Sequence, residues 1–219
     1  LHLNNAFRAY VHEPWTRDLT ESQSLARIVE MIKNCPREAV NFATLDLETA
    51  TAIRQFALIA QIQKHVDKET PIRFLIAECE SPATGLSAGG FAKLFGLAHI
   101  TDVAPLFETP SRRENGSRIM ERLVEEETYR DYVKDRKRIS IQTGFSDAGR
   151  FIGQISATLS IERYYHGLAA LLDKAKLDDV EILIFSTHGE SMGRGAHPGD
   201  LHTRLHYLMT DEARQRFAV

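Results

Sequence analysis

The sequence predicts an α/β fold in which parallel strands alternate with long helices. Two observations lead to this prediction. Short apolar runs rich in β-branched and aromatic residues recur along the chain, and stretches with the 3.6-residue period of helices separate them. The runs are apolar nearly throughout, which is typical of strands buried on both faces of a parallel sheet. The alternation indicates βα units, as an open sheet or as part of a barrel.

Five runs are expected to be strands, in the order Ala39–Leu47, Ile72–Glu78, Ile100–Phe107, Arg138–Gly144 and Glu181–Thr187. Five stretches are expected to be helices, in the order Asp18–Lys33, Glu48–Val66, Ala83–Leu97, Arg113–Arg136 and Phe151–Lys176. Apolar residues recur at helical spacing in the longer stretches, and Ala83–Leu97 is the shortest and is rich in glycine.

Composition and charge narrow the class of protein. The 219 residues are 43% hydrophobic and 26% charged, with a formal net charge of −3. No Pro/Ser/Gly-rich linker interrupts them, so residues 1–219 are expected to form a single domain. Nucleic acid and anionic membranes are not expected as partners, because binding them needs a basic surplus. Two cysteines are too few for a disulfide framework, so the expected location is cytoplasmic.

Polar residues gather where the predicted strands end. Glu108 follows one strand, Asp147 follows another, and His188 follows the last. Function gathers at the carboxyl ends of parallel strands. Glu108 and Asp147 are therefore candidate ligands of a hard divalent cation such as Mg²⁺. Alternatively, each carboxylate caps the helix that follows it.

A glycine-rich segment, His188–Gly199, follows the last predicted strand. Glycine permits close approach of backbone N–H groups to an oxyanion, and Arg194 adds a guanidinium fork suited to phosphate or carboxylate. The alternative is an ordinary connecting loop. The segment matches neither the GxxxxGK[ST] loop nor GxGxxG, so nucleotide binding is not indicated.

Three segments together resemble the phosphoenolpyruvate carboxylase family. They are VAPLFET at Val103–Thr109, GFSDAGR at Gly144–Arg150, and FSTHGESMGRG at Phe185–Gly195. The family shows PLFET, then GYSDSxKD, then FHGRGGxxGRGG, in this order. The resemblance is strongest over residues 72–198.

The resemblance implies a fold and a reaction. The fold would be a TIM-type β/α barrel with many added helices, of which this chain would be a central part. The reaction would be that of a carboxy-lyase, which forms oxaloacetate and phosphate from phosphoenolpyruvate and bicarbonate with Mg²⁺ or Mn²⁺. Carbon dioxide fixation feeding the tricarboxylic acid cycle, a homo-oligomer and a cytoplasmic location are implied as well.

The resemblance also implies roles for individual residues. Glu108 and Asp147 would bind the metal. His188, Arg194 and Arg150 would be catalytic, with Arg150 standing where the family has a lysine near bicarbonate. The substrate would lie against three glycines of the glycine-rich segment, Gly189, Gly193 and Gly195.

Departures from the family pattern leave two other functions open. The glycine-rich segment lacks the family's first arginine, and Glu190 stands in that neighbourhood. The family's upstream catalytic histidine motif and later arginines are not in these 219 residues, so the chain alone is expected to be inactive. The alternatives are another metal-dependent barrel enzyme that forms an enolate from phosphoenolpyruvate or a keto acid, and a non-catalytic barrel with a regulatory role.

Overall fold

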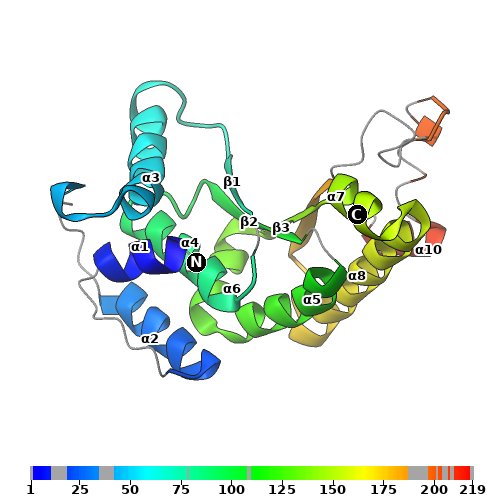
Figure 1. Ribbon diagram of the computed structural model, residues 1–219, viewed down its shortest axis with the longest axis horizontal. Helices are drawn as coiled ribbons and strands as arrows, with labels where there is room; N and C mark the ends of the chain where they lie inside the picture. Colours follow the sequence, from blue (N-terminus) through cyan, green and yellow to red (C-terminus); the bar gives the residue numbers. More distant parts are fainter. Residues whose placement is uncertain are drawn as a thin grey trace. The chain divides into compact units, whose positions relative to one another are not determined.

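The computed structural model describes residues 2–10, 19–34, 42–77, 79–107, 110–186, 197–200, 202–203, 207 and 210–217. Over these ranges the chain is a helix-rich α/β structure (Figure 1). Its strands are β1 (Ile72–Ile76), β2 (Thr101–Phe107), β3 (Arg138–Thr143) and β4 (Glu181–Ser186). These strands confirm four of the five predicted ones.

The strands form one sheet in the order β1-β2-β3-β4. β2 pairs in parallel with β3, and β3 pairs in parallel with β4. Strands that are consecutive in the chain are therefore neighbours in the sheet, with helices in the connections between them. This is the arrangement of part of a β/α barrel, and it confirms the predicted fold class.

Helices make up most of the rest of the described chain. They are α1 (His2–Tyr10), α2 (Glu21–Asn34), the 3₁₀ helix η1 (Phe42–Thr44), α3 (Leu47–His65), α4 (Pro82–Leu94), α5 (Pro110–Glu125), α6 (Glu127–Arg136), α7 (Phe145–Ile152), α8 (Gln154–Ala175) and α10 (Asp211–Phe217). None of them combines the length and the apolar character that crossing a membrane requires, as far as the described ranges extend.

The predicted strand Ala39–Leu47 is wrong over its described part. Phe42–Thr44 is the 3₁₀ helix η1, and α3 begins at Leu47. The Asp46 carboxylate accepts hydrogen bonds from the Thr49 backbone N–H and from the Thr49 hydroxyl, both at 2.8 Å. An aspartate that caps the first turn in this way stabilises the start of a helix, even where the apolar run before it has β propensity.

Two breaks between helices were not predicted from the sequence. Arg113–Arg136 becomes α5 and α6, because Glu126 between them has extended backbone dihedrals. The predicted helix Phe151–Lys176 corresponds to α8, and Gly153, at φ 79° and ψ 160°, separates it from α7, which the sequence pattern did not predict. Apolar periodicity continues through both breaks, so the sequence pattern does not reveal them.

The chain falls into two compact units. The first comprises residues 1–74 and 81–103, and the second comprises residues 75–80 and 104–219. Compact units need not be separate domains, so a single domain over residues 1–219 stays a prediction.

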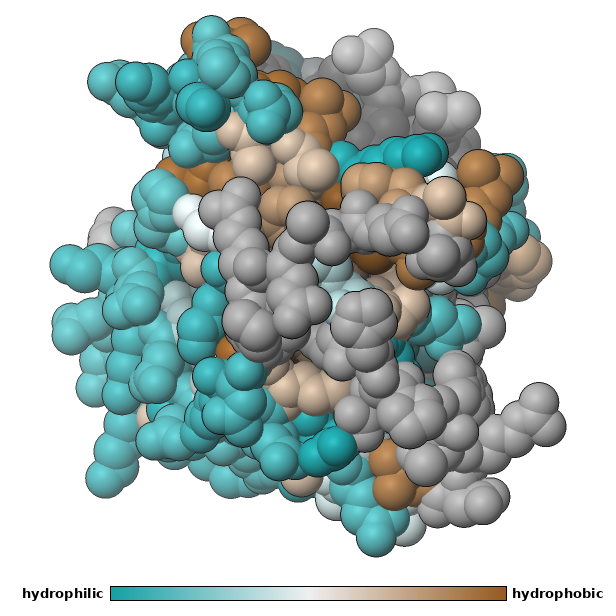
Figure 2. Space-filling view, turned by 90° about the vertical axis from the view of Figure 1, so that its left-hand side faces the viewer, coloured by the Kyte–Doolittle hydropathy of each residue, from teal (hydrophilic) through white to brown (hydrophobic). Residues whose placement is uncertain are grey.

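Aromatic rings form the core of the first unit. The Phe91 ring lies at the centre, 5.2 Å from Phe7 and 5.1 Å from Phe56 between ring centroids, and Phe74 lies 4.5 Å from Phe56. These rings join α1, α3, α4 and β1. Hydrophobic residues also reach the surface on and beside α3, including Leu58 and Val66. Figure 2 shows such brown patches among hydrophilic residues on the face it presents.

In the second unit, α8 covers one face of the sheet. Phe107 of β2 contacts Tyr164 of α8, with ring centroids 5.4 Å apart. The hydroxyl groups of Thr143 on β3 and Tyr165 on α8 are hydrogen-bonded at 3.4 Å. Because Phe107 and Thr143 are register partners, they lie on the same face of the sheet. This face is therefore the one that the helices bury.

Candidate functional site

The carboxyl ends of β2, β3 and β4 are aligned. Phe107 pairs with Thr143, and Thr143 pairs with Ser186. The Gly144 N–H also donates to the Phe107 carbonyl at 3.5 Å. Each of the three segments that carry the motifs therefore leaves the sheet at the same edge, which we call the carboxyl edge. Polar groups at this edge of a parallel sheet are the usual place for a binding site.

Helix α7 carries the second motif and starts directly after β3. Its N-cap residue is Gly144, and Phe145 and Ala148 are buried beneath it. Asp147 lies in the first turn of α7, so it is not the N-cap residue of this helix. A carboxylate in a first turn still interacts favourably with the helix dipole. Arg150 lies in the last turn and is exposed.

Several predicted site residues lie outside the described residues. They are Glu108, His188, Gly189, Gly193, Arg194 and Gly195, and for Asp147 only the backbone is described. Their roles stay predictions. Across the ranges given above, no three His, Cys, Asp or Glu side chains come together in a way that could hold a metal ion. The chemistry of the pair Glu108 and Asp147 suits Mg²⁺ or Mn²⁺, because such ions take one or two carboxylates and complete their shell with water and substrate oxygens.

Sequence reasoning missed two polar residues on β3, Ser140 and Gln142. Side chains alternate along a strand, so these two point away from the face that α8 covers. Ser140 is 5% exposed and Gln142 is 8% exposed. The Ser140 hydroxyl and the Gln142 side-chain carbonyl have no hydrogen-bond partner among the described residues. Their signal was the alternation of polar and apolar residues in RISIQT, within a run interpreted as apolar nearly throughout.

The helix-covered side of the second unit holds neutral phenols. Tyr129 and Tyr164 are buried, and burial raises the pKa of both phenols well above the usual value. The Tyr164 hydroxyl has no hydrogen-bond partner within the described ranges. These phenols stay protonated at neutral pH and supply no charge to the carboxyl edge.

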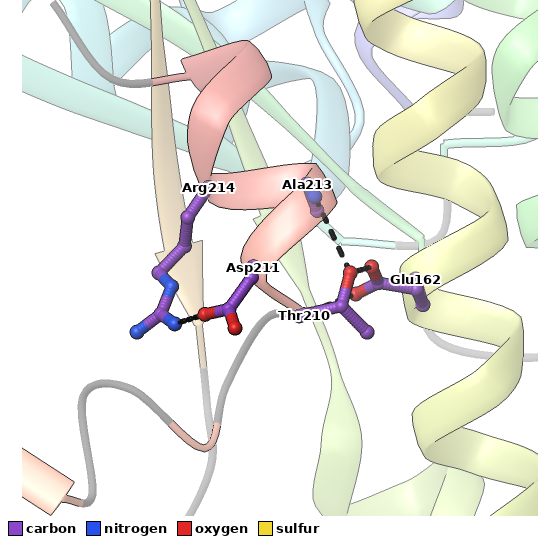
Figure 3. Close-up of polar contacts among 5 residues, drawn as sticks. All are labelled: Glu162, Thr210, Asp211, Ala213 and Arg214. Atoms are coloured by element: carbon purple, nitrogen blue, oxygen red, sulfur yellow. Dashed lines mark hydrogen bonds and ion pairs between the residues drawn. The ribbon is translucent and has the colours of Figure 1, made fainter.

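The chain returns to α8 after the glycine-rich segment. The Thr210 hydroxyl donates to the Glu162 carboxylate, and the Ala213 N–H donates to the Thr210 hydroxyl oxygen at 3.3 Å (Figure 3). Thr210 thus starts α10 and ties it to α8 at the same time. Arg214 and Asp211 form an ion pair within α10. β4 and α10, which flank this part of the sequence, both belong to the second unit.

Together these features define an α/β protein whose candidate site lies at the carboxyl edge of a parallel sheet. The family model for phosphoenolpyruvate carboxylase matches residues 7–201. The chain belongs to the phosphoenolpyruvate carboxylase family. The match reaches well beyond residues 72–198 on its N-terminal side, so α2 and α3 belong to the family architecture as well.

Similar curated proteins carry the same name. The phosphoenolpyruvate carboxylase of Corynebacterium efficiens is 26% identical over 194 residues, which cover 83% of this chain and 21% of that protein. That of Marinomonas sp. is 28% identical over 151 residues, 69% of this chain and 16% of that protein. That of Tolumonas auensis is 28% identical over 125 residues, which cover 57% of this chain and 14% of that protein. The chain thus spans about a fifth or less of the length of these relatives.

Proposed function

We propose that this chain forms part of a carboxylase that converts phosphoenolpyruvate and bicarbonate to oxaloacetate and phosphate, with Mg²⁺ or Mn²⁺ as cofactor. The observation that carries the proposal is the register of β2, β3 and β4. It aligns the points at which the three family-like segments leave the sheet along one carboxyl edge. The active protein would be a cytoplasmic homo-oligomer, and the 219 residues alone would be inactive.

The proposed roles follow from the charges in the reaction. A phosphoryl group passes from phosphoenolpyruvate to bicarbonate, and the enolate that remains is then carboxylated. Arg150 and Arg194 would neutralise the oxyanions of the two substrates, since positioned cations favour phosphoryl transfer. His188 would hold or move a proton. The glycines Gly189, Gly193 and Gly195 would let backbone N–H groups approach the substrate.

The metal would be held by Glu108 and Asp147. When bound, a divalent cation supplies charge neutralisation for phosphate and enolate oxygens. The pairing of β2 with β3 would place the two carboxylates at one edge of the sheet. Asp147 would be presented by the first turn of α7, which Phe145 and Ala148 anchor.

Glu190 favours a second candidate function. An acidic residue in the glycine-rich segment repels phosphate and bicarbonate unless it is paired. Another metal-dependent enzyme that forms an enolate from phosphoenolpyruvate or a keto acid would need no bicarbonate at this position. A barrel that retains the metal residues without catalysis, in a regulatory role, would show metal binding without turnover.

The test is oxaloacetate formation by the complete natural polypeptide that contains these residues, with phosphoenolpyruvate and Mg²⁺, with and without bicarbonate. Product that depends on bicarbonate supports the carboxylase. Pyruvate release that is independent of bicarbonate favours the second enzyme. Metal binding by a folded protein with no product of either kind favours the regulatory role.

A further inference from the structure

The face of β3 that points away from α8 buries two polar groups without partners. Ser140 and Gln142 are each more than nine-tenths buried, and the Ser140 hydroxyl and the Gln142 Oε1 atom have no hydrogen-bond partner in the described part of the chain. A buried polar group without a partner destabilises the fold, so native proteins keep few of them. A ligand that completes the hydrogen bonds of one of these groups would explain why that group is retained.

Gln142 is the one of the two that lies at the carboxyl edge. It is the next-to-last residue of β3, and its register partners are Leu106 of β2 and Phe185 of β4. Leu106 comes two residues before Glu108 in the sequence, and Phe185 comes three residues before His188. Ser140 lies two residues, or about 7 Å, further from that edge. Of these two unpartnered groups, the Gln142 amide is therefore the one nearer to the exits of the three motifs along the strands.

The chemistry of the unpaired atom identifies the class of ligand. Oε1 of Gln142 is an acceptor, so its partner must be an O–H or N–H donor. The phosphate of phosphoenolpyruvate has a second pKa of about 6, so near pH 8 this substrate offers only acceptor oxygens. Bicarbonate carries both an O–H and anionic oxygens. Its HO–C–O edge matches a primary amide, because each of the two groups places one donor beside one acceptor.

We propose that the Gln142 side-chain amide binds bicarbonate, with Oε1 accepting the bicarbonate O–H and Nε2 donating to a neighbouring bicarbonate oxygen. This inference rests on the proposed carboxylase function. It assigns discrimination between the two anionic substrates to a neutral group. The arginines attract both anions by charge, whereas the amide selects the one that has a hydroxyl group to donate.

The test measures the KM of each substrate in variants of the complete natural polypeptide, in buffers freed of dissolved carbon dioxide. Gln142→Met keeps the length of the side chain and removes both hydrogen bonds. It is expected to raise the KM for bicarbonate about tenfold or more, while the KM for phosphoenolpyruvate stays within about twofold. Gln142→Glu keeps the acceptor and adds a repelling charge, so its KM for bicarbonate is expected to rise further.

Ser140→Ala is the matched control, because Ser140 lies on the same strand and face and is equally buried. Its KM for both substrates is expected to stay at the parent value. Unchanged bicarbonate KM values in both Gln142 variants would overturn the inference, as would an equal rise in both KM values. A fall in Mn²⁺ affinity at unchanged bicarbonate KM would assign the amide to metal-bound water instead and would also overturn it.

The activity of the parent protein distinguishes failure of this inference from failure of the proposed function. Bicarbonate-dependent product from the parent, combined with unaffected Gln142 variants, rejects the inference and leaves the proposed function standing. A folded, metal-loaded parent that forms no such product rejects the proposed function, and the inference is rejected with it.

Discussion

Both compact units bury aromatic rings and polar side chains, and the contrast lies between a cluster of rings in the first and unpartnered polar atoms in the second. The first unit is built around aromatic rings on α1, α3 and α4, with Phe7, Phe56 and Phe91 fully buried. The second unit buries phenol hydroxyls and strand polar groups, of which Tyr164, Ser140 and Gln142 have unpartnered atoms within the described ranges. Apolar rings gain free energy from burial, whereas an unpaired polar atom loses it.

Under the proposed function, this contrast would separate stability from function within one chain. The rings of the first unit make contacts that stabilise the fold and offer no chemistry. The unpartnered polar atoms of the second unit weaken the fold, and the motifs leave the sheet in the same unit. Buried groups that break a rule of stability are expected at functional sites. Substitutions in the first unit are therefore expected to change mainly stability, and those at the carboxyl edge of the second unit mainly binding.

The largest effect is expected in the second unit, from Asp147→Asn. Replacing a carboxylate ligand by a neutral amide should abolish binding of Mn²⁺ to the folded complete polypeptide, because hard divalent cations require anionic oxygen ligands. Manganese paramagnetic-resonance titrations would measure it, with circular dichroism as the control for folding. Superimposable titrations of variant and parent would show that Asp147 is not a ligand.

The largest stability effect is expected in the first unit, from Phe91→Ala. Removing this central ring leaves a cavity next to Phe7 and Phe56 and should cost about 3–5 kcal/mol. Hydrogen exchange would locate the loss in α1, α3 and α4. Phe91→Leu is the control and should cost less, since it keeps most of the volume. A loss of protection spread evenly over both units would contradict the prediction that Phe91 stabilises the first unit in particular.

Gly153→Ala tests the break between α7 and α8. Gly153 has φ 79° and ψ 160°, a conformation nearly restricted to glycine, so the substitution should cost about 1–3 kcal/mol. Urea unfolding measures the loss. Gly89→Ala, in helix α4 of the first unit, is the control. A Cβ atom there meets nothing within 4 Å, and stability should rise slightly.

Two adjacent tyrosines of α8 should respond differently to the loss of the hydroxyl group. Tyr165→Phe removes a hydroxyl that is hydrogen-bonded to Thr143, and it should cost about 1 kcal/mol. Tyr164→Phe removes a buried hydroxyl with no partner in the described ranges, so stability should stay the same or rise by about 1 kcal/mol. The denaturant midpoints of the two variants, compared with that of the parent, measure these changes in stability. Equal losses would mean that Tyr164 has a partner.

The smallest effect is expected at the cap of α3, and it depends on pH. Hydrogen bonds from the Thr49 backbone N–H and hydroxyl lower the pKa of Asp46 below its usual value. The ionised cap therefore contributes stability above about pH 4, and this contribution is lost as pH falls through the lowered pKa. Asp46→Ala should be less stable than the parent at pH 7, with a difference that shrinks in acid. Asp46→Asn, which still caps, should show a weaker pH dependence.

The sequence alone predicted the fold class, four strands and the family. Strands β1 to β4 were found because apolar runs of strand length are local signals. The motifs at Val103–Thr109, Gly144–Arg150 and Phe185–Gly195 were found because they are contiguous in the chain. Asp46 was missed although its signal was local, because the apolar run before it suggested a strand.

Tertiary structure decided what depends on residues far apart in the sequence. The register that aligns Phe107, Thr143 and Ser186 is set by hydrogen bonds between strands. The division of β3 into a helix-covered face and a face bearing Ser140 and Gln142 is set by the packing of α8 on Phe107 and Thr143. Residue spacing predicts that alternate side chains of a strand point in opposite directions. Only the packed neighbour decides which direction meets α8 and which bears the unpartnered polar groups.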